Sequence, residues 1–425
     1  MAKKVLKDGE LPSVFDMVQS VDKTAEIIAE SAYSNIKDFI PTGNYILNCC
    51  MSGDIYGGIP CGRVTTFYGP SSVGKSFLAC SCAREAQKKG YTVIYLDSEG
   101  SIDAKFVSRL GVDPTKLIIK QVSTIAETSQ FIANICDQLQ KQEDEYGKHQ
   151  NVMIVLDSLG NLTSDKERED TMSGANKRDM TKAQEVKAMF RVNATPLARL
   201  GIPMIVNNHS YAQIGAYVPT QVMSAGTGLT YNSSITIELS AAKLDDKANE
   251  AAAASKQGAD TTTKNGILVT AKPVKSRFCR PYKVKFQIPY FCAPNQFIGL
   301  EAFMNWENAG VGRGTLITEK DYNKLTDAAK EKIKVFDFNG TTMYAELKDS
   351  CRNIICKHLG RAVSVTEFFS PTVFTPEFLE YLNTNVIHPM FDLPDQSSFE
   401  DIKEIEDMIT TGEQVSSDEE NSEEN

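Results

Sequence analysis

The stretch Tyr68-Gly69-Pro70-Ser71-Ser72-Val73-Gly74-Lys75-Ser76 combines glycine, lysine and serine in a spacing that can hold phosphate groups. The glycines let the backbone curl so that its N–H groups point at the β- and γ-phosphates of a nucleotide. Lys75 adds positive charge there, and Ser76 can ligate Mg²⁺. The β-rich run Arg63–Tyr68 precedes this loop and a helical stretch beginning at Phe77 follows it. We therefore expect the residues from Gly69 to Phe77 to bind a nucleotide.

Two carboxylates follow apolar runs later in the chain. Asp157 ends the run Val152–Leu156, where it could hold a Mg²⁺-bound water and complete the metal site begun by the loop serine. The run Thr92–Leu96 delivers the segment Asp97–Gly100 to the same sheet edge. Within it, Glu99 is the candidate catalytic base that would orient and deprotonate an attacking water. An apolar run followed by an aspartate is common, and Glu99 could instead be a helix-capping or surface carboxylate. The position of both acids downstream of a phosphate loop favours the functional interpretation.

The elements that must carry these residues can be predicted from the hydrophobic pattern. Short β-branched or aromatic runs alternate with helix-length segments, and the runs are Arg63–Tyr68, Thr92–Leu96, Leu117–Lys120, Val152–Leu156 and Pro203–Val206. This alternation predicts an α/β fold, with a mostly parallel central sheet flanked by helices and the nucleotide at the carboxyl ends of the strands. Two further strands are expected at Ile235–Leu239 and Gly266–Thr270, separated by a flexible surface insertion over Ala241–Asn265.

Weaker patterns flank this core. Apolar positions within Val21–Phe39 fit one face of a helix, which could pack on a neighbouring subunit or equally on its own domain. Beyond about Gly310 the pattern changes to helices and short strands punctuated by Pro371 and Pro376. We expect a small C-terminal α/β domain there, ending near Leu393.

Composition limits the class of protein. With 425 residues and 41% hydrophobic content, the chain can bury one large core with smaller additions. No apolar run approaches the roughly 18 residues that a bilayer span needs, and the N-terminal segment is polar, so we expect no membrane partner and a cytoplasmic location. The 10 cysteines include no pair of CxxC motifs, which favours buried free thiols over a zinc site.

The net charge of −10 seems to disfavour nucleic acid, whose phosphates attract lysine and arginine. Its distribution reverses that conclusion. From Glu400 to the end there are 11 acids and 1 base, so 55 − 11 = 44 acids and 45 − 1 = 44 bases remain in the body. The body is neutral and the tail carries the excess. Such a tail either competes with DNA for basic surface or is a solubilising, disordered end.

Several motifs, taken in order, resemble recombinases of the RecA family. Behind the phosphate loop, Leu96-Asp97-Ser98-Glu99 is followed by Phe106 and by Leu110-Gly111-Val112-Asp113. The later matches are Leu156–Leu162, Val206–His209, Gly226–Gly228 and Val274–Arg277. Together they are most similar to the UvsX-type recombinases of large tailed phages, over roughly Ile40–Pro289, and the acidic tail also fits.

The resemblance implies a RecA-like P-loop core that uses ATP and Mg²⁺. It implies a DNA-dependent ATPase that forms a homo-oligomeric helical filament on single-stranded DNA and exchanges strands with homologous duplex DNA in recombination, repair and replication. Single-strand-binding and mediator proteins are further candidate partners, and the location would be the host cytoplasm if a phage encodes the chain. The alternatives are a RecA-like hexameric DNA helicase and a non-hydrolysing, ATP-gated interaction protein.

The same resemblance assigns roles to single residues. Asp103 and Phe106 match positions that contact the adenine, although a capping aspartate and a core phenylalanine would look the same. His209 falls where the family senses the γ-phosphate; RecA itself has glutamine there, whereas the UvsX type has histidine. Lys275 and Arg277 match catalytic positions that reach across a subunit interface to the neighbour's ATP, in an interface that does not close and so builds a filament.

Two segments match the family's DNA-binding loops. The first, about Ser164–Lys182, is suited to a phosphate backbone through Lys166, Arg168, Lys177 and Arg178. The second, Ser210–Gly226, could stack on or wedge between bases through Tyr211, Gln213 and Tyr217. The alternative is that both segments are ordinary solvated loops.

These patterns divide the chain into four parts. We expect an N-terminal oligomerisation segment over residues 1–39 and a RecA-like ATPase core over 40–309, with the flexible insertion at 241–265. A small C-terminal domain over 310–395 and an acidic disordered tail over 396–425 complete the prediction.

Overall fold

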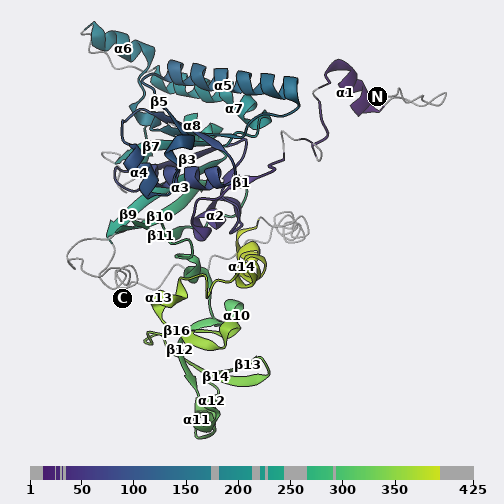
Figure 1. Ribbon diagram of the computed structural model, residues 1–425, viewed down its shortest axis with the longest axis vertical. Helices are drawn as coiled ribbons and strands as arrows, with labels where there is room; N and C mark the ends of the chain where they lie inside the picture. The colour runs from purple at the N-terminus through teal and green to yellow at the C-terminus, as the bar shows by residue number, and fades with distance from the viewer. Residues whose placement is uncertain are drawn as a thin grey trace, which may run out of the picture.

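The computed structural model describes residues 13–23, 25–28, 31, 35–173, 181–212, 221–224, 228–243, 266–290 and 293–392. A nine-stranded sheet forms the body of the molecule, and a five-stranded sheet lies at the far end of its long axis from α5 (Ile125–Tyr146) (Figure 1). The acidic tail and most of the expected insertion lie outside the described residues.

The larger sheet is mostly parallel, as the sequence predicts. Its strands run in the spatial order β11-β10-β9-β3-β7-β6-β4-β5, with β8 paired to β7. Their bounds are β3 Val64–Gly69, β4 Thr92–Asp97, β5 Leu117–Gln121, β6 Val152–Asp157, β7 Met204–Ala212, β8 Gln221–Met223, β9 Ile235–Lys243, β10 Gly266–Lys275 and β11 Val284–Pro289. Pairings among β3, β4, β5, β6, β7 and β9 are parallel, whereas β10, β11 and β8 join antiparallel. The predicted central strands coincide with β3 to β7.

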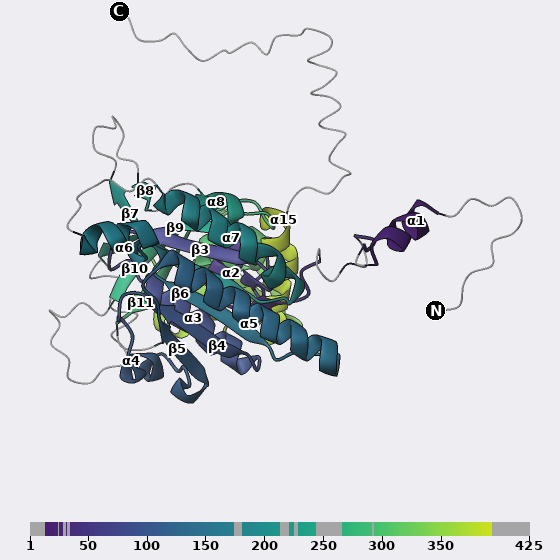
Figure 2. The same ribbon diagram turned by 90° about the horizontal axis from the view of Figure 1, so that it is seen from above.

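Helices cover both faces of this sheet, because both faces of its central strands are apolar. On one face of the sheet, side chains of α2 (Tyr45–Ser52) and α3 (Lys75–Lys88) pack against the strands and form a large core cluster with them. Side chains of α5 and α7 (Lys182–Arg199) pack with the other face. Seen from above, α5 and α7 lie side by side over the strands (Figure 2).

The smaller sheet is antiparallel throughout, in the order β13-β14-β12-β15-β16. Its strands are β12 Val311–Ile317, β13 Ile333–Phe338, β14 Thr341–Leu347, β15 Ile354–Cys356 and β16 Arg361–Val363. The short helices in this part of the chain are α10 Trp306–Ala309, α11 Glu319–Asn323, α12 Asp327–Lys330, α13 Val365–Phe368, α14 Pro376–Leu382 and α15 His388–Phe391. Buried side chains of α13, α14 and α15 belong to the large core cluster that α2 and α3 also join. A π-helical segment at Asn383–Ile387 joins α14 to α15.

A hydrogen-bonded cluster ties this C-terminal helical segment to the loop after α2. The Asp54 Oδ2 accepts from Asn383 Nδ2 at 3.0 Å and lies 3.1 Å from His388 Nε2. The Ile55 N–H donates to Asn383 Oδ1 at 3.0 Å. Desolvation raises the pKa of Asp54, but the hydrogen bonds from Asn383, the Tyr56 N–H and His388 outweigh it, so this pKa lies below its ordinary value.

The N-terminal helix lies earlier in the chain than the sequence predicts. Helix α1 spans Val14–Val21 with no buried residue, stands away from the body in Figure 1, and is capped by Ser13, whose Oγ accepts from the Asp16 N–H at 3.1 Å. Beyond Val21, the described residues up to Lys37 are not helical, so the helix prediction for Val21–Phe39 is wrong there. Helix α1 begins at a capping serine, which satisfies a backbone N–H of its first turn. In the predicted stretch, Ile27 and Ile28 are 45% and 72% exposed, so tertiary packing does not stabilise a helix there.

A second boundary is also corrected. Strand β9 continues to Lys243, so Ala241 and its two neighbours belong to the sheet and not to the insertion. Among the described residues, none of the helices is both long and apolar enough to cross a bilayer. The described cysteines are free thiols and all but Cys351 are buried, as expected.

Candidate functional site

The phosphate loop connects the end of β3 to the start of α3. Ser72 has a φ of 63° and Gly74 a φ of 94°, and these left-handed conformations curl the backbone of the loop. A Cβ on Gly69 would lie 2.3 Å from the Leu239 carbonyl oxygen, so only glycine fits at that position. Ser71 and Ser72 are exposed, Pro70, Gly74 and Ser76 are half-buried, and Val73 and Phe77 belong to the core.

Lys75 folds back over its own loop. Its side chain is buried, and the ammonium donates to the carbonyl oxygens of Gly69 at 3.0 Å and Pro70 at 2.8 Å. Burial lowers the pKa of this ammonium, while the charges of Asp157 and Glu99 act in the opposite direction. Both carboxylates therefore lie near enough to the lysine to influence its charge.

Asp157 ends β6 and is 1% exposed. Its Oδ2 accepts a hydrogen bond of 2.6 Å from the hydroxyl of Tyr95, on the neighbouring strand β4. Burial raises the pKa of Tyr95 well above its usual range, and the charge of Asp157 adds to that effect. The tyrosine therefore acts as a donor toward the carboxylate.

The ends of β4 and β6 are joined by several hydrogen bonds. The Ser98 N–H donates to the Asp157 carbonyl oxygen at 2.9 Å. The Ser98 Oγ donates to the Ser158 carbonyl oxygen at 2.7 Å and accepts from the Ser158 N–H at 2.8 Å. Asp97 accepts from the N–H groups of Glu99 and Gly100 through its Oδ1. This network fixes the turn that carries Glu99.

Glu99 and His209 meet at this sheet edge. The His209 Nε2 lies 2.7 Å from Glu99 Oε1, and the Ser158 Oγ donates to the same oxygen at 2.6 Å. The side chain of His209 is 30% exposed and that of Glu99 is 23% exposed. Desolvation raises the pKa of Glu99, but the hydrogen bonds from Ser158 and His209 outweigh it, and the pKa lies below its ordinary value. Glu99 is thus ionised at neutral pH and accessible to water.

Strand β7 links this site to the second expected DNA-binding loop. Asn208 Oδ1 accepts from the His209 N–H at 3.0 Å and from the Ser224 Oγ at 2.6 Å, and Asn208 Nδ2 donates to the Ser224 carbonyl oxygen. Tyr211 lies two residues beyond His209 and is 57% exposed. The predicted residues Gln213 and Tyr217 lie outside the described residues.

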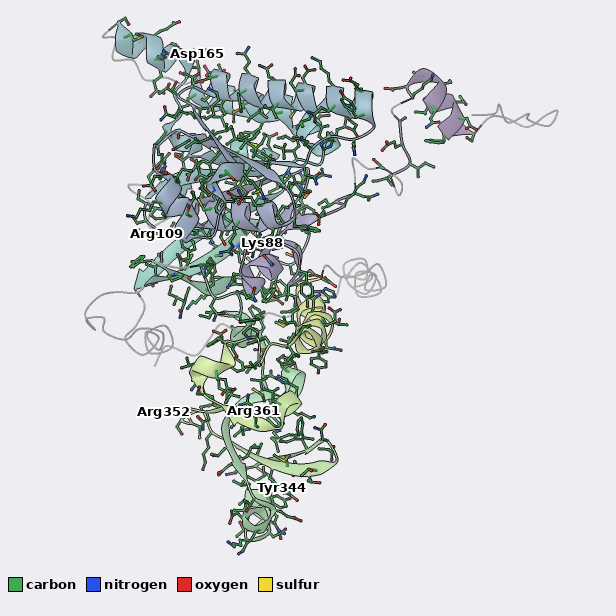
Figure 3. The ribbon with its side chains drawn as sticks, viewed as in Figure 1. Lys88, Arg109, Asp165, Tyr344, Arg352 and Arg361 are labelled. Atoms are coloured by element: carbon green, nitrogen blue, oxygen red, sulfur yellow. The ribbon has the colours of Figure 1, made fainter. Side chains whose placement is uncertain are left out.

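The first expected DNA-binding loop contains α6 (Asp165–Met172), whose first residue is labelled in Figure 3, where the helix projects from the body. Lys166 and Arg168 are both exposed on this helix. Lys182, at the start of α7, donates to the Gly160 carbonyl oxygen at 3.1 Å and so ties the far end of the loop back to the strand end. Lys177 and Arg178 fall in the part of the chain that the structure does not describe.

The remaining predicted residues lie apart from the Glu99–His209 contact. Asp103 caps α4 (Ala104–Arg109) by accepting from the Phe106 N–H at 2.7 Å, and the Phe106 ring packs partly buried against the core. Lys275 donates to the carbonyl oxygens of Thr230 and Tyr231 at 2.8 and 3.0 Å, at the end of α8 (Gly228–Asn232). Arg277 is exposed.

The sequence did not single out Tyr95, Ser158 or Asn208 as site residues. One signal was available for Tyr95: side chains alternate along a strand, so Tyr95 shares the face of Asp97. Ser158 and Asn208 lie within motifs that were recognised, but their contacts depend on which strands are neighbours. That order cannot be read from the chain alone.

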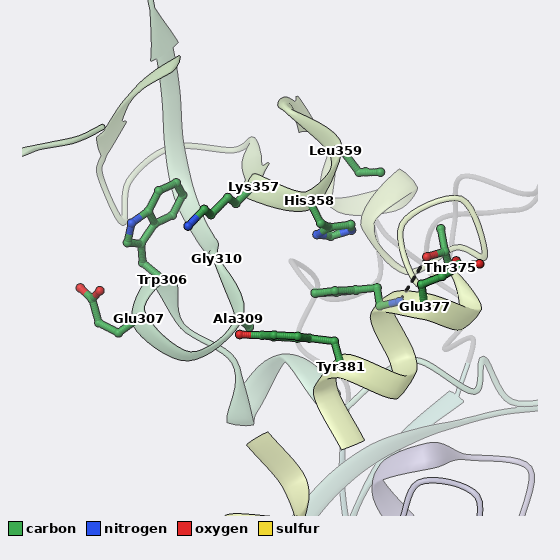
Figure 4. Close-up of a pocket in the computed structure, with 11 residues that line it drawn as sticks. Trp306, Glu307, Ala309, Gly310, Lys357, His358, Leu359, Thr375, Glu377 and Tyr381 are labelled. Atoms are coloured by element: carbon green, nitrogen blue, oxygen red, sulfur yellow. Dashed lines mark hydrogen bonds between the residues drawn. The ribbon is translucent and has the colours of Figure 1, made fainter. Parts of the chain in front are cut away.

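A separate cavity of about 460 Å³ lies beside the smaller sheet (Figure 4). Aromatic side chains form much of its wall, including Trp306, Phe378 and Tyr381, and Lys357 and His358 border it as well. All of its lining residues fall between Trp306 and Tyr381 in the sequence, so none comes from the phosphate loop or the ends of β4, β6 and β7. The cavity is therefore distinct from the candidate nucleotide site.

The chain is similar to known proteins of one family. The model of the RecA N-terminal domain matches residues 20–290. The recombination and repair protein of Enterobacteria phage T4 is 31% identical over 211 residues, covering 49% of this chain and 51% of the phage protein. Protein RecA of Crocosphaera subtropica is 28% identical over 250 residues, which cover 58% of this chain and 62% of that protein. Protein RecA of Fusobacterium nucleatum is 29% identical over 295 residues, which cover 67% of this chain and 69% of that protein.

The alignments with the first two relatives span about half to three fifths of those proteins. The family match, in contrast, covers more than half of this chain, including the phosphate loop, Glu99, Asp157 and His209. The resemblance inferred from the motifs is thereby confirmed, and the chain belongs to the RecA family.

Proposed function

We propose that this chain is a DNA-dependent ATPase that forms helical filaments on single-stranded DNA and catalyses homologous pairing and strand exchange in recombination and repair. One observation carries the proposal: the Glu99–His209 contact lies at the sheet edge that also holds the phosphate loop and Asp157. Membership of the RecA family supports it, because the family match over residues 20–290 includes all of these residues, and relatives named RecA and a recombination and repair protein are similar to the chain.

The residues fit ATP and Mg²⁺ as cofactors. The Ser76 hydroxyl and the Asp157 carboxylate are the hard oxygen ligands that Mg²⁺ prefers. Lys75 and the curled backbone of residues 69–74 would hold the phosphates, and Asp103 and Phe106 would contact the adenine. When bound, Mg²⁺ would neutralise charge that develops on the phosphates.

Glu99 would act as the base. Its lowered pKa keeps it ionised, and its partial exposure gives water access to the carboxylate. Ser158 and His209 both engage Oε1, which orients the carboxylate and leaves Oε2 to receive a proton. The protein's contribution is therefore the placement of a proton acceptor next to the phosphate loop.

His209 would couple nucleotide to DNA. A γ-phosphate within reach of the imidazole would compete with Glu99 for it, and a shift of His209 would be transmitted along β7 to Tyr211 and, through Asn208, to Ser224. A ligand can shift an equilibrium only by contacting the two states differently. His209 supplies that difference, because it would contact ATP but not ADP.

DNA would bind along the two loops beyond these strand ends. Lys166 and Arg168 are exposed on α6 and would track the phosphate backbone together with Lys177 and Arg178. Tyr211, Gln213 and Tyr217 would contact bases. Lys275 and Arg277 would reach the ATP of a neighbouring subunit, so that hydrolysis depends on filament assembly. Single-strand-binding and mediator proteins would regulate that assembly.

The proposed domain limits follow the two sheets. Residues 1–39 would form an oligomerisation segment, 40–309 the ATPase core, 310–395 the small C-terminal domain and 396–425 an acidic tail. The larger sheet lies within the second range and the smaller sheet within the third. No contact described above favours the helicase alternative over strand exchange.

The test is ATP hydrolysis with and without single-stranded DNA, with negative-stain imaging of the same samples. Stimulated hydrolysis together with helical filaments is the expected result. Closed rings would favour the hexameric helicase, and particles without stimulated hydrolysis would contradict both. The Glu99→Gln variant is the matched control, because it should still form filaments while losing hydrolysis.

A further inference from the structure

The structure assigns to Tyr95 the role of a positioning residue for Asp157. We infer that its hydroxyl holds one oxygen of this carboxylate and so orients the other toward a divalent cation bound with the nucleotide. This inference rests on the proposed function, since it takes Asp157 to be part of the metal site. Tyr95 is not among the site residues predicted from the sequence, and it lies outside the motifs that resemble the RecA family.

The geometry follows from the sheet. Strands β4 and β6 are parallel neighbours, with Tyr95 paired to Val155 and Asp97 to Asp157. Because side chains alternate along a strand, Tyr95 and Asp157 lie on the same face, and this face is covered by α3. The tyrosine is completely buried, and its hydroxyl reaches Asp157 Oδ2 at 2.6 Å. A distance this short is typical of a hydroxyl donating to an ionised carboxylate.

Tyr95 is the sole hydrogen-bond donor to the Asp157 side chain among the described residues. The other carboxylate oxygen makes no hydrogen bond within that part of the chain, and the charge of Asp157 acts on the Lys75 ammonium of the phosphate loop. Tyr95 thus holds one oxygen of Asp157, and the carboxylate lies near the lysine of the phosphate loop.

A phenylalanine would fill nearly the same core volume as Tyr95, so packing alone does not require the hydroxyl. Without it, the carboxylate would be free to rotate and would lose its one fixed partner. Partners of metal-binding carboxylates typically contribute 10- to 100-fold in metal affinity, because they fix the orientation of the ligand. A purely structural tyrosine would instead change stability without a selective effect on the metal.

The experiment is Mn²⁺ binding followed by electron paramagnetic resonance, on the full chain with ADP present. Tyr95→Phe is expected to weaken Mn²⁺ binding about tenfold. Its affinity for a fluorescent ADP analogue in the absence of metal should match the wild type. Tyr91→Phe is the matched control, because it removes another buried hydroxyl, whose contact is with Cys61 Sγ at 3.4 Å and not with the site.

A second background separates orientation from damage to the fold. In Asp157→Asn, the added change Tyr95→Phe should have no further effect on Mn²⁺ affinity, because the carboxylate that the hydroxyl orients is already gone. An equal loss in both backgrounds would overturn the proposal. It would also be overturned by a Tyr95→Phe protein that binds Mn²⁺ as tightly as the wild type.

These outcomes are distinguishable from failure of the proposed function. If the wild type binds Mn²⁺ with ADP and hydrolyses ATP while Tyr95→Phe is unaltered, only the positioning role is wrong. If the wild type takes up no Mn²⁺ in the presence of nucleotide, the metal role of Asp157 is wrong and the role of Tyr95 is rejected with it.

Discussion

His209 and Glu99 are in direct contact, with Nε2 of the histidine 2.7 Å from Oε1 of the glutamate, although 110 positions separate them in the sequence. Glu99 follows β4 and His209 lies on β7, and these two strands are not neighbours, since β6 lies between them. The contact therefore joins the candidate base to the strand that leads into the second proposed DNA-binding loop.

We expect His209→Ala to bind ATP with nearly unchanged affinity. Stimulation of its ATP hydrolysis by single-stranded DNA should fall about tenfold, because coupling energies between sites are typically 1–3 kcal/mol. The measurement is ATP affinity alongside steady-state hydrolysis with and without DNA. His149→Ala is the control, since the ring of this half-buried histidine hydrogen-bonds only to the Gln150 carbonyl oxygen among the described residues. Unchanged stimulation in His209→Ala would contradict the coupling role.

Lys75→Ala should weaken ATP binding by at least about tenfold, because a hydrogen bond from a charged group contributes about 1.5–3 kcal/mol. The measurement is the Kd of a fluorescent ATP analogue. Lys88→Ala, in the last turn of the same helix, removes an exposed lysine paired with Glu85 and should leave the Kd unaltered. Equal affinity of wild type and Lys75→Ala would exclude the phosphate role of this lysine.

Tyr211→Ala is expected to reduce affinity for single-stranded DNA about tenfold, since stacking of a base on an aromatic ring contributes about 1–3 kcal/mol. Fluorescence anisotropy of a labelled oligonucleotide with ATP present measures the effect. Tyr146→Ala removes a similarly exposed tyrosine from the end of α5 and serves as the control. Loss of DNA binding to the same extent in both variants would argue against a specific contact at Tyr211.

Asp54→Asn should lower the free energy of unfolding at neutral pH by about 1 kcal/mol, after solvent screening of this half-buried group is allowed for. The folded-state pKa of Asp54 is depressed, so its contribution is present above the unfolded-state pKa and disappears as pH falls through the folded-state value. Urea unfolding of wild type and variant should therefore converge at acidic pH.

The control is Asp137→Asn, which disrupts an exposed ion pair with Lys141 on α5 and should change stability very little. A difference between wild type and Asp54→Asn that persists unchanged below the folded-state pKa would show that ionisation of Asp54 is not its source.

Much of the larger sheet could be predicted from the sequence. Apolar runs such as Val152–Leu156 are long enough and bounded clearly enough to indicate buried strands, and the phosphate loop is recognisable from its residue types. The same reasoning brought Glu99 and Asp157 to one sheet edge, because parallel strands present their carboxyl ends together.

Other features depend on information that local patterns lack. The contact of His209 with Glu99 and that of Tyr95 with Asp157 are set by strand order and register. The apolar pattern within Val21–Phe39 suggested a helix, but in a short segment such a pattern does not by itself specify one, because most helical stability comes from tertiary packing. The antiparallel order of the smaller sheet likewise arises from tertiary pairing.

The Asp54–Asn383 hydrogen bond has a consequence for the order of events during synthesis. Its partners are 329 positions apart, so the loop after α2 leaves the ribosome long before the residue that completes its hydrogen bonds has been translated. Until then the Ile55 N–H has no amide oxygen of Asn383 to bind. The phosphate loop and its strands can assemble earlier, whereas the Asp54–Asn383 hydrogen bond must wait until residue 383 has been translated, because contacts between distant residues form only after the intervening segment exists.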